Sequence, residues 1–141
     1  MLDTNVWLDW LVFADPSLAP LREAVGAGRA EICIDEACAE ELARVLARPF
    51  GRRSLDAAAQ ARAMEECRRL CRPIVRDAGD ARLPACRDAD DQKFLEAAAA
   101  AGADALVTKD EALLELVRRR SARLPFRILR PERFSLDLDQ A

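Results

Sequence analysis

Four carboxylates carry the clearest chemical signal in this sequence, and they lie so far apart that only folding can bring them together. They are Asp3, Glu41, Asp91 and Asp110. Carboxylates gathered in one place repel one another, and a bound divalent cation is the usual way in which a protein offsets that repulsion. A cation held by carboxylates beside an open cleft is typical of phosphodiester chemistry. The four residues therefore predict a metal site that acts on phosphodiesters.

Glu41 is expected on the inward face of a helix that Asp35 caps. The apolar stripe of this helix is formed by Cys38, Leu42, Val45 and Leu46. Glu41 lies along the stripe, whereas Glu40 is rotated by about 100° and is predicted to pair with Arg44 on the surface. A carboxylate on a buried stripe is rare unless it is paired or binds a metal. The plainer alternative is a half-buried position from which the carboxylate reaches solvent.

Three aspartates cluster at the expected start of another helix. The helix dipole favours negative charge there, so capping alone explains one or two of them. Asp88 is the expected cap, Asp91 faces inward on the same side as Phe94, and Asp90 is the next best ligand. Asp91 is therefore the predicted ligand of this cluster.

Asp3 and Asp110 are expected beyond the ends of two strands, where ligands bind in open parallel sheets. Asp3 precedes Thr4 and Asn5, which we expect to support a metal ligand as neighbouring donors. Asp110 follows a strand that ends at Thr108, whose hydroxyl could serve the metal shell or a phosphate. The plainer alternative is that both aspartates only cap helices.

The residue types that are absent narrow the chemistry. The chain has no His, which removes the usual general base, the Ser-His-Asp triad and most zinc chemistry. Its five cysteines form no Cys-x-x-Cys pair, which argues against a disulfide framework or a structural zinc site. Carboxylate oxygens remain as the main ligands, and they favour Mg²⁺ or Mn²⁺.

The formal net charge of −3 means that a surface for nucleic acid must be a local patch. All but two of the 22 basic residues are arginines, which bind phosphate as a rigid fork. The candidate nucleic-acid contacts are Arg48, Arg52, Arg53 and Lys109. The plainer alternative is that such residues lie on solvated helix faces.

The elements that must position these residues alternate between strands and helices. Strands are predicted over residues 1–3, 31–34, 74–76, 105–108 and 126–129, and helices over residues 6–13, 17–25, 35–48, 54–70, 88–101 and 111–119. Ser17, Asp35, Ser54 and Asp88 are the expected caps, Gly102 ends a helix, and Pro131 opens a last short turn. This order predicts an α/β fold with a mainly parallel sheet covered on both faces. We expect one domain over residues 1–141, and a cytoplasmic protein because no signal peptide or long apolar run is present.

The chain resembles the PIN domain family of nucleases nearly from end to end. The resemblance rests on five stretches in the family's order, which are residues 2–6, 41–46, 88–98, 102–110 and 128–134. The last stretch is similar to the tail of a subgroup described as toxin components of toxin–antitoxin pairs. One departure is that only Met1 and Leu2 precede Asp3, where family members have several more residues. We therefore expect the first strand to be a stub.

The resemblance implies a three-layer α/β/α sandwich with a central, mainly parallel sheet. It also implies a ribonuclease that depends on Mg²⁺ or Mn²⁺, with Asp3, Glu41, Asp91 and Asp110 as ligands. Asn5 and Thr108 match supporting polar positions. The partners that it implies are an RNA substrate, a small antitoxin protein and a second copy of the chain in a homodimer.

Two other functions stay open at this point. A catalytically weak or inactive relative could bind RNA or a protein partner, and the short first strand supports this alternative. A haloacid-dehalogenase-like phosphatase also begins with an aspartate at a strand end. That group needs a second Asp two residues further on, and Asn5 occupies the position here.

Overall fold

The computed structural model describes residues 1–74, 83–119 and 123–134. Its α-helices are α1 (Thr4–Leu11), α2 (Ala19–Gly26), α3 (Glu36–Leu46), α4 (Ala57–Leu70), α5 (Gln92–Ala101) and α6 (Glu111–Arg118). Three short 3₁₀ turns are η1 (Pro16–Leu18), η2 (Gly51–Arg53) and η3 (Ala89–Asp91). The strands are β1 (Ile32–Asp35), β2 (Cys71–Ile74), β3 (Ala105–Val107) and β4 (Arg127–Leu129). Strands therefore alternate with helices, as the sequence predicts.

All of the strand pairing is parallel in the described residues. β1 pairs with β2, and β3 pairs with β4. The first residues of the chain join the edge of β3, where Leu2 forms an isolated parallel bridge with Val107. Val107 N–H donates to Met1 O at 2.8 Å, and Asp3 N–H donates to Val107 O at 3.1 Å. The first strand is thus a stub, and the ladder consists of two parallel pairs rather than one continuous sheet.

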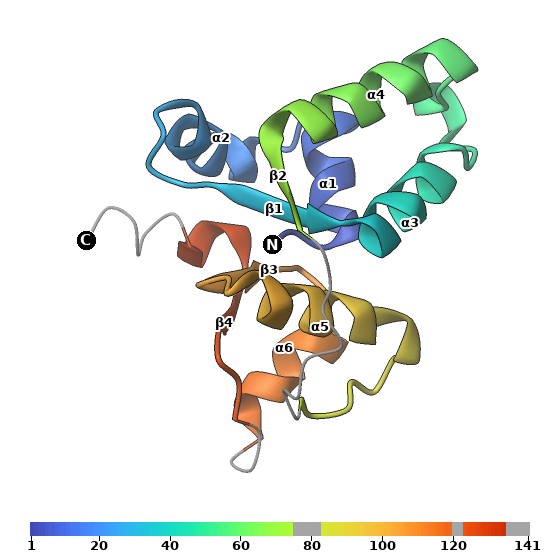
Figure 1. Ribbon diagram of the computed structural model, residues 1–141. Helices are drawn as coiled ribbons and strands as arrows, with labels where there is room; N and C mark the ends of the chain where they lie inside the picture. The colour runs from blue at the N-terminus through green and yellow to red at the C-terminus, as the bar shows by residue number, and fades with distance from the viewer. Residues whose placement is uncertain (75–82, 120–122, 135–141) are drawn as a thin grey trace.

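The strands lie between two groups of helices. Figure 1 shows them crossing the middle of the molecule, with α1 to α4 on one side and α5 and α6 on the other. α5 contacts β1, β2 and β3, so it packs across both strand pairs. The core between these layers includes Trp7, Leu42, Leu95, Leu106 and Leu113, each at most 1% exposed. The result is the α/β architecture expected from the alternation of elements.

Aspartate, rather than serine, caps two of the helical segments for which serine was predicted. Asp35 caps α3 as expected, since its side chain accepts from Cys38 N–H at 2.9 Å. The prediction that Ser54 caps the next long helix is wrong, because Asp56 fills that place and Ser54 Oγ accepts from a preceding backbone N–H instead. Likewise Asp15 caps η1, and Ser17 lies inside that turn. A carboxylate accepts a charge-assisted bond, which makes it the stronger cap.

Two boundaries around the middle of the chain also differ from prediction. β2 spans Cys71–Ile74 instead of residues 74–76, of which 75 and 76 lie outside the described residues. Asp88 caps η3 only, and α5 begins at Gln92. The predicted stop at Gly102 is confirmed, since it adopts φ 62° at the end of α5, a conformation that favours glycine. Residues 131–134 form a last helical turn, as Pro131 suggested.

No helix in the described ranges is long and apolar enough to cross a membrane.

Candidate active site

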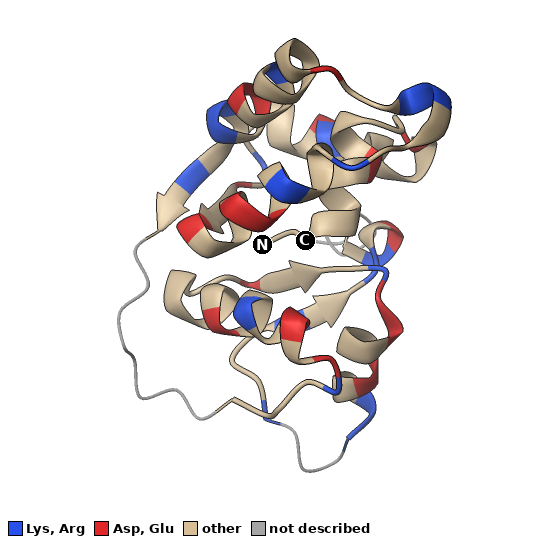
Figure 2. Ribbon diagram, turned by 90° about the vertical axis from the view of Figure 1, so that its right-hand side faces the viewer, with Lys and Arg blue, Asp and Glu red and all other residues tan. Residues whose placement is uncertain are grey.

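A small cavity of about 210 Å³ gathers the predicted site residues. Its lining consists of Asp3, Thr4, Asn5, Glu41, Val45, Arg48, Asp90, Asp91, Phe94 and Asp110. All four predicted ligands are in this list, together with three of the predicted supporting residues. Figure 2 looks onto the side of the molecule toward which β1 runs, and it shows acidic segments on both sides of the strand layer. The fold therefore brings together carboxylates that are distant in sequence.

Each of the four carboxylates comes from a different element. Asp3 ends the first strand stub and caps α1, and Asp110 follows β3 and caps α6. Glu41 projects from the middle of α3, and Asp91 is the last residue of η3. The alternative that Asp3 and Asp110 only cap helices therefore holds in part, because each of them caps a helix and also lines the cavity.

The helix phasing that selected Glu41 is borne out by exposure. The Glu41 side chain is 19% exposed and faces the cavity, whereas Glu40 is an exposed residue. The predicted ion pair between Glu40 and Arg44 is wrong, since neither side chain has a partner in the described structure. Arg44 is therefore left as an uncompensated charge.

Thr108 links two of the carboxylates. Its hydroxyl donates to Asp3 Oδ2 and accepts from Asp110 N–H at 2.9 Å. Asp3 Oδ1 accepts from Val6 N–H at 2.9 Å, so both oxygens of this carboxylate are oriented by donors. Thr108 is fully buried and Asp3 is only 3% exposed, so water competes little for these bonds.

The pKa of two site aspartates, Asp3 and Asp91, is higher than that of an aspartate in water. Burial is the main cause that raises the pKa of Asp3 to about 6, against hydrogen bonds from Thr108 and Val6 that lower it. Burial also raises the pKa of Asp91 to about 7, and the neighbouring carboxylates of Asp110, Asp88 and Asp3 raise it further. The cavity therefore concentrates negative charge that the protein compensates incompletely.

Lys93 is a site residue that the sequence reasoning missed. Its ammonium lies 2.5 Å from Glu41 Oε1, and Thr4 donates its hydroxyl to Glu41 Oε2. The sequence offered a weak signal for this role, which is that Lys93 is one of two lysines in the chain and lies two residues after Asp91. The pair gives Glu41 a positive partner inside the acidic cavity.

The carboxylate oxygens of the cavity are suitable ligands for a hard divalent cation, but they do not surround a cation position in the present arrangement. Asp91 Oδ2 is buried without a hydrogen-bond partner, and an acceptor of this kind is expected to have one. Carboxylate oxygens are the ligands that Mg²⁺ and Mn²⁺ prefer. Within the described ranges, however, no group of three or more Asp, Glu, Cys or His side chains could hold a metal ion as it stands. Binding an ion therefore requires the carboxylates to rearrange.

Lys109 has a different role from the predicted nucleic-acid contact. Its ammonium pairs with Asp9 at 2.7 Å and Asp15 at 2.8 Å, and it does not line the cavity. Burial lowers the pKa of Lys109, but its hydrogen bonds to these two carboxylates outweigh that effect and raise it overall. Lys109 thus fastens the β3–α6 connection to the segment that follows α1.

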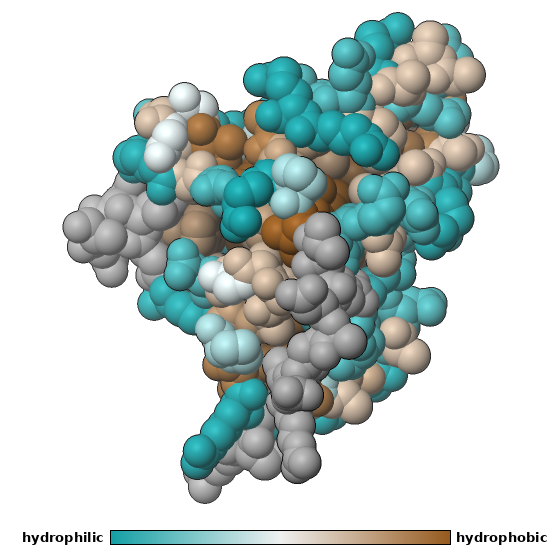
Figure 3. All heavy atoms as spheres, in the orientation of Figure 1, coloured by the Kyte–Doolittle hydropathy of each residue, from teal (hydrophilic) through white to brown (hydrophobic). Residues whose placement is uncertain are grey.

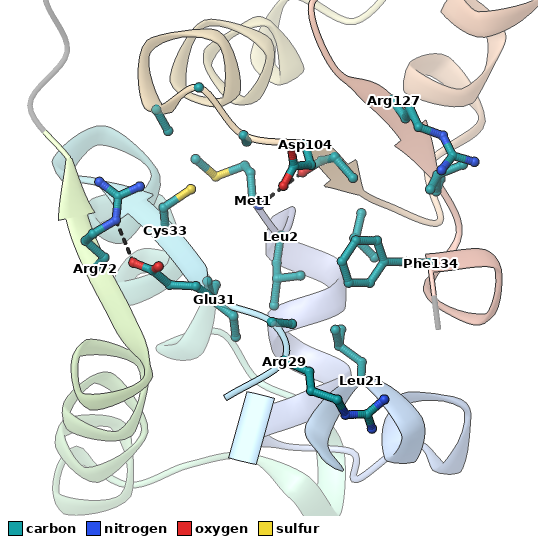
Figure 4. Close-up of a pocket in the computed structure, with 18 of the residues that line it drawn as sticks. Met1, Leu2, Leu21, Arg29, Glu31, Cys33, Arg72, Asp104, Arg127 and Phe134 are labelled. Atoms are coloured by element: carbon teal, nitrogen blue, oxygen red, sulfur yellow. Dashed lines mark hydrogen bonds and ion pairs between the residues drawn. The ribbon is translucent and has the colours of Figure 1, made fainter. Parts of the chain in front are cut away.

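A larger cavity of about 530 Å³ lies elsewhere and lacks an acidic cluster. It opens between β1, the first two residues and β3, and Figure 4 shows Met1 and Leu2 at its centre. Only two carboxylates line it, and one of them, Glu31, is paired with Arg72 at 2.6 Å. In Figure 3 hydrophobic surface appears in the middle of this face, where the N terminus lies in Figure 1. This cavity therefore does not offer the predicted chemistry.

The comparisons with known proteins give one finding. A family model described as PIN domain matches residues 1–112 of the chain. Proteins with this domain are generally nucleases and usually use divalent metal ions. No curated protein and no solved structure matches the chain.

Proposed function

The chain belongs to the PIN domain family, and from this we propose that it is an endoribonuclease that depends on Mg²⁺ or Mn²⁺. The observation that carries the proposal is the gathering of four distant carboxylates around one cavity beside the strand ends. Burial, with a further contribution from neighbouring carboxylates, raises the pKa of both Asp3 and Asp91. Such a site suits a divalent cation and a phosphodiester substrate.

Asp3, Glu41, Asp91 and Asp110 are the residues that would hold the cation. A divalent cation in such a site supplies an activated water and stabilises the charge that develops on the leaving oxygen. Thr108 fixes the orientation of Asp3 and the backbone of Asp110, and Thr4 and Lys93 orient Glu41. Arg48 lines the same cavity, and we propose that it contacts a phosphate next to the one that reacts. No histidine is available as a general base.

The test is cleavage of a single-stranded RNA by the full chain with Mg²⁺ or Mn²⁺, and with EDTA. We expect cleavage that EDTA abolishes and that Asp91→Asn lowers by at least about a hundredfold. Asp56→Asn is the matched control, because Asp56 caps α4, does not line the cavity, and Asn caps a helix about as well as Asp. Cleavage that is unchanged in Asp91→Asn would refute the assignment.

A catalytically weak module that binds RNA or a protein partner is the second candidate. It is favoured by the ion pair between Lys93 and Glu41 and by the lack of a group already able to hold a metal ion among the described residues. Failure of Mn²⁺ to bind in a calorimetric titration, with RNA binding retained, would favour this candidate over the nuclease.

The finer biological role is also a proposal. We propose that the chain is the toxin of a toxin–antitoxin pair, inhibited by a small antitoxin protein, and that it forms a homodimer. Its support is the resemblance of residues 128–134 to such proteins. Growth arrest on expression, relieved by the product of a neighbouring reading frame, is the result expected.

A further inference from the structure

Lys93 places a positive charge where its own helix disfavours one. It lies in the first turn of α5, directly after the aspartates of η3. The positive end of the helix dipole lies at that turn and destabilises a cation there. The Lys93 side chain is nevertheless only 21% exposed, and its ammonium reaches α3, where it lies 2.5 Å from Glu41 Oε1. The acidic groups around the cavity therefore offset the cost of holding a cation at this position.

Glu41 has both of its carboxylate oxygens committed to groups of the protein. Lys93 binds Oε1, and Thr4 donates its hydroxyl to Oε2. The Glu41 side chain is 19% exposed, so salt and water screen the ion pair only in part. Among the ion pairs of the described residues, this is the one that engages a predicted metal ligand. Glu41 is thus neutralised by a cation of the chain itself, whereas Asp91 Oδ2 is buried without a partner.

A divalent cation at Glu41 would share its carboxylate with the Lys93 ammonium. Two positive charges at such short range repel each other, and more strongly where water is partly excluded. In the part of the chain that the structure describes, no acidic group can hold an ion as it stands, which agrees with a Glu41 carboxylate that is already occupied. An ion binds only those molecules in which the site is competent, so the ion pair lowers the apparent metal affinity.

We propose that Lys93 is a built-in counter-ion of the metal site, which occupies Glu41 in the metal-free protein and leaves it when the ion binds. Without metal, the ammonium offsets the repulsion among the carboxylates and holds Glu41 beside the cavity. A divalent cation carries twice the charge and binds several carboxylates at once, so it replaces the ammonium at sufficient concentration. Lys93 is therefore a positioning residue that sets the metal concentration at which the site fills. This inference rests on the proposed function for the identity of the ion.

Calorimetric titration of the full chain with Mn²⁺, at constant pH and salt, tests the competition. We expect Lys93→Met, which keeps a long side chain but removes its charge, to tighten Mn²⁺ binding about tenfold, equal to about 1.4 kcal/mol. The melting temperature of the same variant in EDTA should fall, because Glu41 then lacks its cation. Tighter metal binding together with a less stable metal-free protein distinguishes a competitor. A residue that only orients Glu41 would weaken Mn²⁺ binding when it is removed.

Two matched variants separate the ion pair from a general effect of charge. Lys93→Arg keeps the positive charge, and because a guanidinium also pairs with a carboxylate, it should bind Mn²⁺ no more tightly than the wild type. Arg87→Met removes a cation one residue before Asp88, from an exposed pair with Glu115. It changes the net charge as Lys93→Met does, and it should leave Mn²⁺ affinity near that of the wild type.

The wild type offers a readout that needs no substitution. Lys93 and Lys109 are the two lysines of the chain, and their side chains are similarly exposed, at 21% and 28%. The carboxylates that bind Lys109 are Asp9 and Asp15, which do not line the cavity. Acetylation of amines by an N-hydroxysuccinimide ester, measured for each lysine by mass spectrometry, should therefore rise at Lys93 on addition of Mn²⁺ and stay constant at Lys109. Asp91→Asn, which removes a predicted ligand, should abolish the rise.

Failure of the counter-ion proposal is distinct from failure of the nuclease assignment. Mn²⁺ affinity that is unchanged or weaker in Lys93→Met, or acetylation of Lys93 that does not rise with Mn²⁺, would overturn the proposal. If Lys93→Met does not fold, the acetylation of the wild type decides. RNA cleavage combined with a negative result leaves the nuclease standing without the counter-ion. Competition by Lys93 without RNA cleavage leaves the counter-ion and removes the nuclease, and a wild type that binds no Mn²⁺ refutes both.

Discussion

Thr108 is the side chain on which the geometry of the acidic cavity most depends. Its buried hydroxyl donates to Asp3 and accepts from the backbone of Asp110, so one oxygen orients two predicted ligands. Such a hydroxyl is costly to lose, because Asp3 Oδ2 and the N–H of Asp110 would both lose their partner.

Thr108→Val keeps the shape of the side chain and removes the hydroxyl. We expect it to lower the free energy of unfolding by about 2 kcal/mol, measured by urea denaturation, because a buried carboxylate oxygen and a partly buried N–H lose their partner. Mn²⁺ affinity, measured by calorimetry, should fall as well.

Thr108→Ser is the matched control for this change. It retains the hydroxyl and should keep Mn²⁺ affinity near that of the wild type. Equal Mn²⁺ affinity in the valine variant would show that the hydroxyl does not position the ligands.

At the scale of elements, the connection between β3 and α6 joins one side of the acidic cavity to α1. The β3–α6 connection carries Thr108 and Asp110, and Lys109 between them is bound by Asp9 near the end of α1 and by Asp15 of the following turn. The β3–α6 connection is therefore tied to the α1 side of the cavity by two links, which are the hydroxyl of Thr108 to Asp3 and the ammonium of Lys109 to Asp9 and Asp15.

Lys109→Met removes the second link and leaves two carboxylates facing each other. We expect a lower melting temperature by differential scanning fluorimetry, because the like charges of Asp9 and Asp15 then repel at close range. Arg118→Met is the control, since its pair with Glu111 is exposed and spans 3.7 Å, and such pairs contribute little. A melting temperature that falls equally in both variants would contradict the proposed link.

Helix starts show where local sequence rules compete. Ser54 and Asp56 are both good caps, and they stand two residues apart. In the structure Asp56 caps α4, and Ser54 Oγ accepts a hydrogen bond from a backbone N–H in the preceding turn. Local propensity could not separate the two, because the choice depends on where η2 packs against the end of α1.

At the scale of the whole molecule, the absence of histidine makes the site aspartates dominate the titration near neutral pH. The pKa of Asp3 is about 6 in the folded chain, whereas an unfolded aspartate titrates near 4. The folded state thus binds more protons than the unfolded state between these values. The pKa of Asp15, lowered to about 2 by Lys109, affects stability only at lower pH.

We expect the metal-free protein to become more stable as the pH falls from about 7.5 to about 5. Both states are ionised at the upper limit, and protonation of Asp3 in the folded state then relieves the cost of its burial, by about 3 kcal/mol at most. Thermal melts in EDTA across this range test the direction.

Saturating Mn²⁺ should reverse the trend, because ligands must lose their protons to bind a metal. The melting temperature should then rise with pH over the same range. A metal-free stability that rises with pH between 5 and 7.5 would contradict the direction of the Asp3 and Asp91 pKa shifts.

The order of the elements, their parallel pairing and the choice of Glu41 over Glu40 could be predicted from the sequence. The parallel pairing follows from the alternation of strands with helices. The choice of Glu41 follows from helix periodicity, since a helix repeats its inward positions at a fixed interval. The four carboxylates were found for the same reason, because strand ends and inward helix positions are local properties.

The tertiary structure alone decided which groups surround those carboxylates. Thr108 reaches Asp3 across 105 residues of sequence, and Lys109 reaches Asp15 across 94. The ion pair between Lys93 and Glu41, and the lack of a partner for Arg44 in the described structure, also depend on tertiary packing. No local pattern encodes such pairs, because they depend on how separate elements pack. The sequence therefore determined which acids face inward, and packing determined which charges and hydroxyls they meet there.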